Sequence, residues 1–94
     1  MRQVVVTPKF RRAYRKYVSR DQRLKRAIDE TLLRMQEDLF APFLSAHKLS
    51  GQLMGLWACS CGYDCRIVFV IEYDEQTKAE VILLLDIGTH DEVY

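Results

Sequence analysis

The chain of 94 residues lacks the features that mark membrane, secreted and repetitive proteins. No apolar run approaches the roughly 18 residues that a membrane span needs, and residues 1–4 do not begin a signal peptide. There is no internal repeat, linker or low-complexity segment. The composition, 49% hydrophobic and 29% charged, fits a soluble globular protein. We therefore expect a single domain, residues 1–94, located in the cytoplasm.

Cysteine is scarce but clustered, because Cys59, Cys61 and Cys65 lie within seven residues. An odd number of cysteines without a secretion signal argues against a disulfide framework. A zinc site completed by His90 or Asp64 is the weaker interpretation, since the spacing matches no common zinc knuckle. We expect the three cysteines to serve as small, partly buried hydrophobic residues on a hairpin. The alternative is that Cys61 and Cys65 are redox-sensitive neighbours across the turn.

Acidic residues are scarce in the first part of the chain and basic residues in the rest. The first 34 residues hold eleven Lys and Arg against three Asp and Glu, a net charge of +8, whereas the remainder carries −7. A basic face could follow a phosphate backbone through salt-sensitive attraction. The plainer interpretation is a solvated helix surface, because Lys and Arg favour helices.

The N-terminal part predicts a strand and two helices. Residues 2–6 contain three consecutive valines and predict the strand. Thr7 and Pro8 mark a helix start, because threonine caps a first turn and proline loses no hydrogen bond at the first helical position. Asp21 caps a second helix, which is expected to end at residues 41–42. Apolar residues recur at helical spacing in both segments, so we expect an antiparallel helix pair.

The C-terminal part predicts three strands, at residues 53–61, 66–73 and 80–87, with turns at 62–64 and 74–78. The N-terminal strand, the helix pair and this three-stranded antiparallel meander make an α+β domain. Its helices pack on one face of a four-stranded, mainly antiparallel sheet. The first strand could pair with the last meander strand or with its neighbour. The opposite face of the sheet would be only partly covered.

The groups able to transfer protons near neutral pH are few. His47 and His90 are the only histidines, and both lie at the ends of predicted elements. Arg66 is the only Lys or Arg between residues 48 and 78, and its planar guanidinium suits a phosphate. RNA cleavage by a neighbouring 2′-hydroxyl needs a base, an acid and a fixed cation. These three residues could supply them.

Each candidate also has a purely structural interpretation. His47, which follows a helix, would ordinarily be a surface residue, and His90 could cap the terminal strand. Asp64 lies in a turn, where aspartate more often hydrogen-bonds to the backbone than takes part in catalysis. Tyr94 could anchor the C-terminus or stack on a base.

Four segments resemble, in order, the RelE/YafQ group of bacterial type II toxins, small ribosome-dependent mRNA endonucleases of the RelE/ParE superfamily. Residues 6–10, Val-Thr-Pro-Lys-Phe, resemble the family's first strand and helix. Residues 47–51, His-Lys-Leu-Ser-Gly, resemble its His-x-Leu-x-Gly segment. Residues 64–69, Asp-Cys-Arg-Ile-Val-Phe, are similar to its Asp-Tyr-Arg-hydrophobic strand. Residues 88–94, Gly-Thr-His-Asp-Glu-Val-Tyr, are similar to the terminus of the YafQ-like branch.

The resemblance implies a RelE-like fold and a metal-independent endoribonuclease without a cofactor, which cleaves mRNA in the ribosomal A site. It implies His47, Asp64, Arg66 and His90 as catalytic residues, and Lys48 and Tyr94 as substrate-binding residues. The expected partners are the ribosome, mRNA and a cognate antitoxin, in a toxin–antitoxin hetero-oligomer, with no membrane involved. The basic first helix would then meet the antitoxin or ribosomal RNA.

One departure from the family pattern leaves other functions open. The YafQ-like branch usually has a histidine four residues before the aspartate, and here that position is Ser60. Activity could therefore be slower, depend on Arg66, or be absent. Two alternatives are a ParE-like toxin that binds DNA gyrase without cleaving nucleic acid, and a weakened homologue retained for antitoxin binding. The histidine pair favours the nuclease, since gyrase poisoning needs no acid–base groups.

Overall fold

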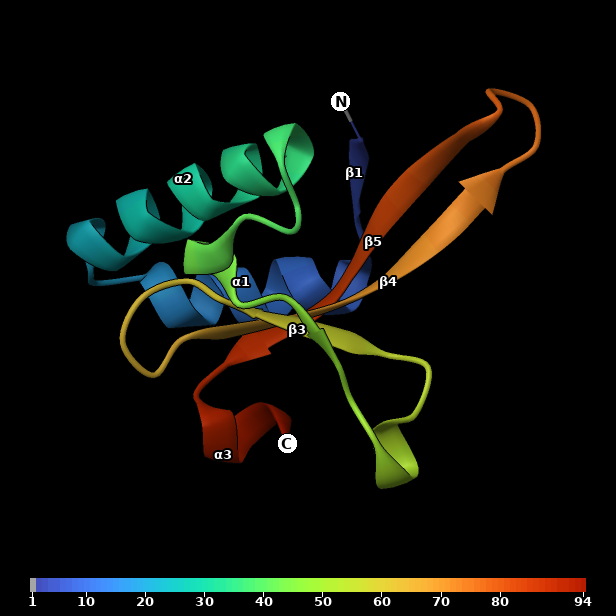
Figure 1. The fold of residues 1–94 in the computed structure, drawn as a ribbon. Coiled ribbons are helices and arrows are strands. Elements are labelled where there is room, and N and C mark those ends of the chain that lie inside the picture. The colour runs from blue at the N-terminus through green and yellow to red at the C-terminus, as the bar shows by residue number, and fades with distance from the viewer. Residues whose placement is uncertain (1) are drawn as a thin grey trace.

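The computed structural model describes residues 2–94 and confirms the α+β class (Figure 1). The elements are β1 (Gln3–Val6), α1 (Pro8–Val18), α2 (Gln22–Glu37), the 3-10 turn η1 (Pro42–Leu44), β2 (His47–Lys48), the 3-10 turn η2 (Gly51–Leu53), β3 (Trp57–Ser60), β4 (Arg66–Asp74), β5 (Ala79–Gly88) and α3 (His90–Val93). None of the helices in this range is long and apolar enough to cross a membrane.

Both long helices begin at the residues that the sequence indicates. The Thr7 side chain accepts a hydrogen bond from the Phe10 backbone N–H at 3.2 Å, and Pro8 occupies the first helical position. Asp21 accepts from the Leu24 N–H at 3.0 Å. The second helix ends earlier than predicted, at Glu37, because the backbone of the next residue leaves the helical region.

The sheet has five strands rather than the predicted four, in the order β1-β5-β4-β3-β2. The additional strand is β2, whose two residues pair antiparallel with the start of β3. β3 is shorter than predicted because η2 occupies residues 51–53. β1 runs parallel to β5, with Gln3 opposite Val81, which settles the pairing that the sequence left open. The other pairs are antiparallel.

A bulge in β5 changes which residues face the helices. Val68 pairs with Asp86, whereas the next residue, Phe69, pairs with Leu84, so Leu85 is the extra residue. The extra residue of a bulge shifts the alternation of side chains, so every later residue of the strand points to the face opposite to the one that strict alternation would give it. Ile87 therefore points into the core, and Gly88 lies opposite Arg66 on the other face.

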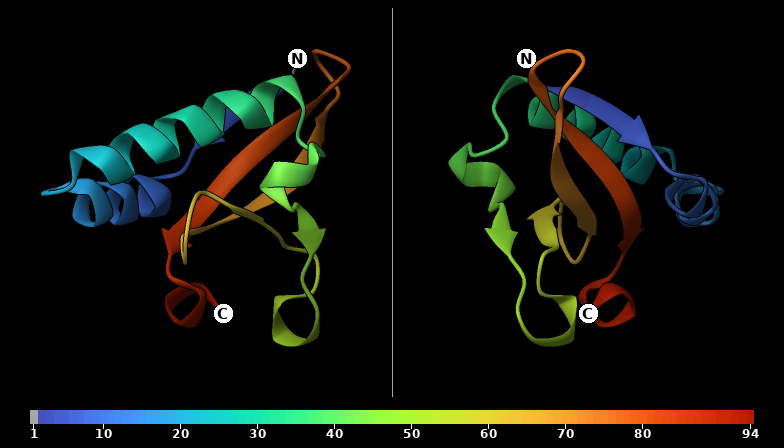
Figure 2. Two further views of the ribbon diagram at one scale, coloured as in Figure 1. Left: turned by 60° about the vertical axis from the view of Figure 1, so that its left-hand side comes forward. Right: turned by 90° about the vertical axis from the view of Figure 1, so that its right-hand side faces the viewer.

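The core lies between the two long helices and one face of the sheet (Figure 2). Its fully buried members come from both layers: Phe10, Ile28, Met35, Leu39 and Leu44 from the helices, η1 and the turn between α2 and η1, and Cys59, Ile67, Phe69, Ile82 and Leu84 from the strands. Alternate residues of β3 and β4 point away from this core. The views of Figure 2 place α3 and η2 at the end of the sheet away from α2.

A polar contact links the two long helices. The Tyr14 hydroxyl donates to Asp29 at 2.6 Å, and the Lys25 ammonium lies 2.7 Å from the same carboxylate. Burial acts to raise the pKa of Asp29, but the hydrogen bonds from Lys25 and Tyr14 outweigh it and hold that pKa below its ordinary value.

Replacing Tyr14 with phenylalanine is expected to lower the free energy of unfolding by about 1 kcal/mol, because one hydrogen bond to a half-exposed carboxylate is lost. The full decrease in the free energy of unfolding should be seen above the unfolded-state pKa of aspartate, about 3.9. The decrease should become smaller as the pH falls and Asp29 takes up a proton. Urea unfolding at pH 7 and pH 3 measures both values. A difference of equal size at the two pH values would contradict this role of Asp29.

Candidate active site

Arg66 is the centre of a row of paired residues that crosses three strands. It lies opposite Ser60 on β3 and opposite Gly88 on β5. Directly paired residues point to the same face, and the flanking Ile67 belongs to the core, so this row faces away from the long helices. Arg66 is half-buried, and its Nη1 donates to the Cys65 carbonyl at 2.9 Å. Its guanidinium is thus held at the end of β4.

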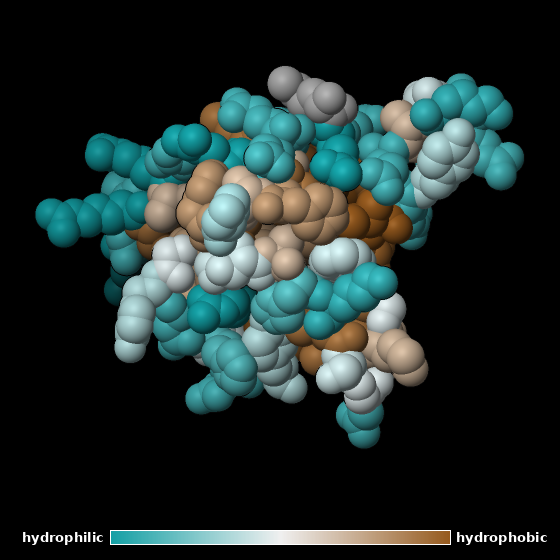
Figure 3. All heavy atoms as spheres, in the orientation of Figure 1, coloured by the Kyte–Doolittle hydropathy of each residue, from teal (hydrophilic) through white to brown (hydrophobic). Residues whose placement is uncertain are grey.

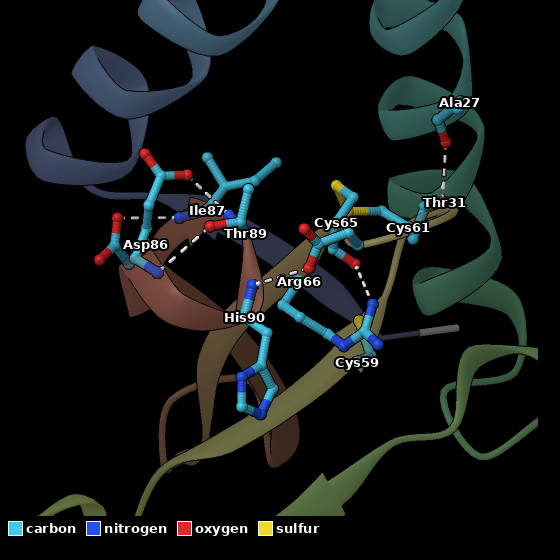
Figure 4. Close-up of a disulfide and its surroundings, with 12 residues drawn as sticks. Ala27, Thr31, Cys59, Cys61, Cys65, Arg66, Asp86, Ile87, Thr89 and His90 are labelled. Carbon is cyan, nitrogen blue, oxygen red and sulfur yellow. Dashed lines mark hydrogen bonds between the residues drawn. A yellow bond between two sulfur atoms is a disulfide. The ribbon is translucent and has the colours of Figure 1, made fainter. Parts of the chain in front are cut away.

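The turn between β3 and β4 connects Arg66 to the C-terminal segment. Asp64 occupies the left-handed region with φ of 50°, and its carboxylate accepts the backbone N–H of His90 at 3.2 Å (Figure 4). The Cys65 carbonyl accepts the Cys61 N–H at 3.0 Å. Asp64 thus contacts the backbone of a proposed catalytic residue, which is the structural alternative raised for it above.

The cysteines correct the argument against a disulfide framework, and they confirm the alternative that Cys61 and Cys65 are neighbours across the turn. Cys61 and Cys65 form a disulfide that closes the turn, with Cα atoms 5.0 Å apart. The odd count gave the wrong indication because two cysteines pair across one turn while the third stays free. Cys59 is that free cysteine and is fully buried, as expected of a small hydrophobic residue. Burial raises its pKa to about 12, so the thiol stays protonated.

No group of three or more His, Cys, Asp or Glu side chains that could hold a metal ion occurs among residues 2–94.

The C-terminal segment forms a short helix, α3, which was not predicted from the sequence. Thr89 caps it by accepting the Glu92 N–H at 3.2 Å, and the Glu92 carboxylate accepts the Thr89 N–H at 2.8 Å. These two bonds form a capping box. The rings of His90 and Tyr94, one turn apart, meet edge to face with centroids 4.5 Å apart. Both side chains are therefore held by α3.

His47 points to the same face of the sheet as Arg66. It lies opposite Ala58 on β3, two residues before Ser60. Its Nδ1 lies 2.8 Å from the Ser45 carbonyl oxygen. A carbonyl only accepts, so Nδ1 carries the proton in this contact and Nε2 of a neutral ring is left with a free lone pair. This tautomer presents a base to the solvent.

Lys48 lies on the other face of the sheet. It pairs with Trp57, which packs against the core, and its ammonium sits 5.6 Å from the centroid of the Trp57 ring. Adjacent residues of a strand point to opposite faces, which separates Lys48 from His47. The structure therefore brings His47, Arg66 and His90 to one side and leaves Lys48 apart from them.

The distances between these groups leave room for a nucleotide. Two strand spacings of about 4.8 Å and two residues along the strand separate the Cα atoms of His47 and Arg66 by roughly 12 Å. Arg66 is also close enough to Tyr94 for its charge to affect the pKa of the Tyr94 phenol. Burial raises the pKa of the Tyr94 phenol, and the Arg66 charge opposes this. The phenol stays neutral and protonated at physiological pH.

Three supporting residues, Gly88, Thr89 and Glu92, were not singled out from the sequence. The capping box could have been found, because Thr89 and Glu92 have its Thr-x-x-Glu spacing. The contribution of Gly88 could not, because it arises from packing. A Cβ added at Gly88 would lie 3.1 Å from the Glu92 Cβ and 3.2 Å from a methyl group of Val93.

Replacing Gly88 with alanine is therefore expected to push α3 away from the sheet and to move His90 and Tyr94. A displacement of this kind lowers the rate of a positioned reaction by up to about 100-fold. The measurement is the amide NMR shifts of residues 89–94, together with the rate of the reaction proposed below. Gly55→Ala adds a methyl group in open space but places alanine at a φ of 96°, so it serves as the control for backbone strain away from α3. Unchanged shifts at α3 would contradict the packing argument.

This fold is shared with solved structures of YoeB/ParE and YafQ toxins, which confirms the resemblance at the level of the fold. No family model matches the chain, and no curated protein matches its sequence.

Three solved structures illustrate the likeness. A YoeB/ParE toxin from Agrobacterium tumefaciens aligns with a TM-score of 0.75 and 17% identity, over 94% of this chain and 98% of that chain. A YafQ mutant from E. coli aligns with a TM-score of 0.76 and 9% identity, over 100% and 99%. A chain of the YoeB–YefM complex from Staphylococcus aureus aligns with a TM-score of 0.69 and 15% identity, over 96% and 98%.

Proposed function

We propose that this protein is the toxin of a type II toxin–antitoxin system and acts as a ribosome-dependent mRNA endonuclease. The observation that carries the proposal is the row around Arg66. The only cation of the three central strands lies on the face of the sheet away from the long helices, with His47 on that face and His90 tied to the adjoining turn. The similar solved structures are toxins, which supports the same class of function.

The proposed reaction is an internal transfer of the phosphodiester. Nε2 of His47 takes the proton of the 2′-hydroxyl, whose oxygen attacks the phosphorus. The Arg66 guanidinium stabilises the charge that builds up on the phosphoryl oxygens. His90 donates a proton to the departing 5′-oxygen. The products are a 2′,3′-cyclic phosphate and a 5′-hydroxyl end, and no water or metal is consumed.

The exposure of the two histidines supports a dependence on the ribosome. His47 and His90 are both exposed, and β2, which carries His47, has only two residues. An open site positions its substrate poorly, and positioning can supply about 7–11 kcal/mol of a barrier. In this proposal the ribosome holds the mRNA in the A site, and the toxin supplies the acid, the base and the cation. Tyr94 stacks on the base beside the scissile phosphate.

The charge distribution supports partners of opposite sign. Five cations of α1 are exposed, namely Lys9, Arg11, Arg12, Arg15 and Lys16. A helix face of this kind attracts ribosomal RNA or the acidic segment of an antitoxin. One similar structure is a toxin–antitoxin complex and another is described as heterotetrameric. We extend to this chain the expectation of a cognate antitoxin that neutralises it in a hetero-oligomer.

The test is primer extension on a message bound to programmed ribosomes, with the same naked RNA as the comparison. Cleavage in the A-site codon on ribosomes, with naked RNA left mostly intact, is the expected result. Cleavage of both substrates alike would remove the ribosome from the proposal. Absence of cleavage combined with double-strand DNA breaks after induction in cells would instead favour a ParE-like gyrase poison.

A further inference from the structure

The turn between β3 and β4 joins three parts of the proposed site. The Cys61–Cys65 disulfide closes this turn. The Cys65 carbonyl accepts hydrogen bonds from the Cys61 N–H at 3.0 Å and from Arg66 Nη1 at 2.9 Å. Asp64, inside the disulfide loop, holds the His90 N–H. Figure 4 shows Arg66, His90 and the disulfide grouped around this one turn. The disulfide therefore constrains the segment from which both Arg66 and α3 are positioned.

One end of the disulfide borders a surface hollow. The hollow has a volume of about 380 Å³ and is lined by Thr31, Arg34, Phe43, Cys61 and Gly62 among others. A Cβ built at Gly62 would meet nothing within 4 Å, so the backbone next to Cys61 is uncovered. Cys65 is completely buried and does not line the hollow. Cys61 is only 2% exposed but lines the hollow, so the hollow is the side from which a small thiol would reach the disulfide.

The same hollow lies by an apolar region of the surface. Figure 3 shows apolar residues across the middle of the face seen in Figure 1. Exposed large apolar side chains of the segment from α2 to η1 are Leu33, Phe40 and Phe43. Arg34, 5.5 Å from the centroid of the Phe43 ring, lies at the rim and pairs with the Glu30 carboxylate at 3.0 Å. Such a surface can receive a small thiol through its carbon skeleton.

We propose that the Cys61–Cys65 pair is a thiol–disulfide exchange site for small-molecule thiols, and that its opening releases Asp64 and Arg66 from the arrangement that cleaves mRNA. The regulatory part of this inference rests on the function proposed above. The oxidised protein is the active form, and the reduced protein is the attenuated form.

The exchange is balanced in two steps. The thiolate of a small thiol attacks the Cys61 sulfur, the bond between the two protein sulfurs breaks, and Cys65 leaves as a thiolate that takes up a proton. A second thiolate attacks the small-molecule sulfur of the mixed disulfide and releases Cys61, which is then protonated. Two small thiols are oxidised to one disulfide, and the protein gains two thiols. Hydrogen peroxide reverses the change by taking two electrons and two protons to form two waters.

The buried Cys59 takes no part, and this permits a clean measurement. Its sulfur lies 3.8 Å from the Met35 sulfur in the core. A Cys59→Ala background leaves only the pair able to react, so a maleimide reagent should count no thiols before treatment with reduced glutathione and two afterwards. The native protein at neutral pH is used, and circular dichroism verifies that the reduced form stays folded.

Two readouts follow the reduction. The first is hydrogen exchange at the His90 amide, expected to quicken at least about tenfold when Asp64 is released. The second is cleavage of ribosome-bound message, expected to fall about tenfold. A double variant, Cys61→Ser with Cys65→Ser, should match the reduced protein and ignore both glutathione and peroxide. If this variant fails to fold, the reduced background protein still provides both readouts.

The outcomes separate the two proposals. Failure of glutathione to generate thiols in the folded protein would overturn the exchange site. Two new thiols with unchanged His90 exchange and unchanged cleavage would overturn the coupling to the site. Absence of cleavage in both redox forms, with His90 exchange still responding, would refute the nuclease function and leave the exchange site and its coupling to α3 standing.

Discussion

Replacing Arg66 with alanine is expected to lower the rate of cleavage of ribosome-bound mRNA by about 100- to 1,000-fold. Removing one preorganised group that stabilises transition-state charge commonly has an effect of that size, about 2.7–4 kcal/mol. Arg66 should have the full effect because the described strands β3, β4 and β5 hold no other Lys or Arg in the paired row. Single-turnover cleavage at saturating toxin measures the chemical step.

Two further variants define what Arg66 contributes. Arg66→Lys keeps the charge but loses the planar fork and the bond to the Cys65 carbonyl, so an intermediate rate is expected. Lys78→Asn is the matched control, because it removes one positive charge from the distant β4–β5 turn. Asparagine also tolerates the positive φ of 59° at that position. A rate for Arg66→Ala within threefold of wild type would sink the proposed role.

Replacing His90 with alanine is expected to reduce cleavage by about 100- to 10,000-fold, the usual contribution of a positioned general acid or base. The contact of His90 with Asp64 uses its backbone N–H, so α3 should stay in place when the side chain is removed. The variant therefore tests the imidazole rather than the helix. The NMR shifts of residues 89–94 verify that the helix is retained.

A second substitution at His90 separates proton transfer from stacking. His90→Phe keeps an aromatic ring against Tyr94, whose ring lies 4.5 Å from that of His90, but has no proton to give. If His90 is the acid, both variants should be equally slow on normal RNA. Both should recover on a substrate with a 5′-thiolate leaving group, which needs no protonation. Activity retained by His90→Phe would show that the ring only supports Tyr94.

The helices and most strands could be predicted because capping residues, turn residues and the spacing of apolar residues determine them within a few residues of sequence. Thr7-Pro8 and Asp21 set the helix starts through hydrogen bonds within one turn. The bulge at Leu85 carries no such signal, because it depends on the register between β4 and β5. The fifth strand was missed for a related reason. Two residues are too short to show a pattern, and β2 exists only because β3 lies beside it.

The candidate site could be predicted less completely than the fold. The resemblance named the histidines, Arg66, Asp64 and Tyr94 from spacing alone, and the structure places His47, Arg66 and His90 on one side. The resemblance also implied Lys48 as a substrate-binding residue, but Lys48 faces away from His47 because adjacent strand residues point to opposite faces. The contact between Asp64 and the His90 backbone spans 26 residues and needs a tertiary structure to be seen. Close packing at Gly88 has the same origin.

Because β1 pairs with β5, the protein can complete its fold only when synthesis of the chain is almost finished. The Thr7 hydroxyl bonds to the Leu84 carbonyl, 77 residues later, so the first strand has no partner until nearly the whole chain has been made. Contacts this distant in sequence form late. Chains truncated before residue 79 should be protease-sensitive and harmless on expression. If the proposed function holds, the ribosome that makes the protein carries an incompletely folded and inactive chain until synthesis is almost finished.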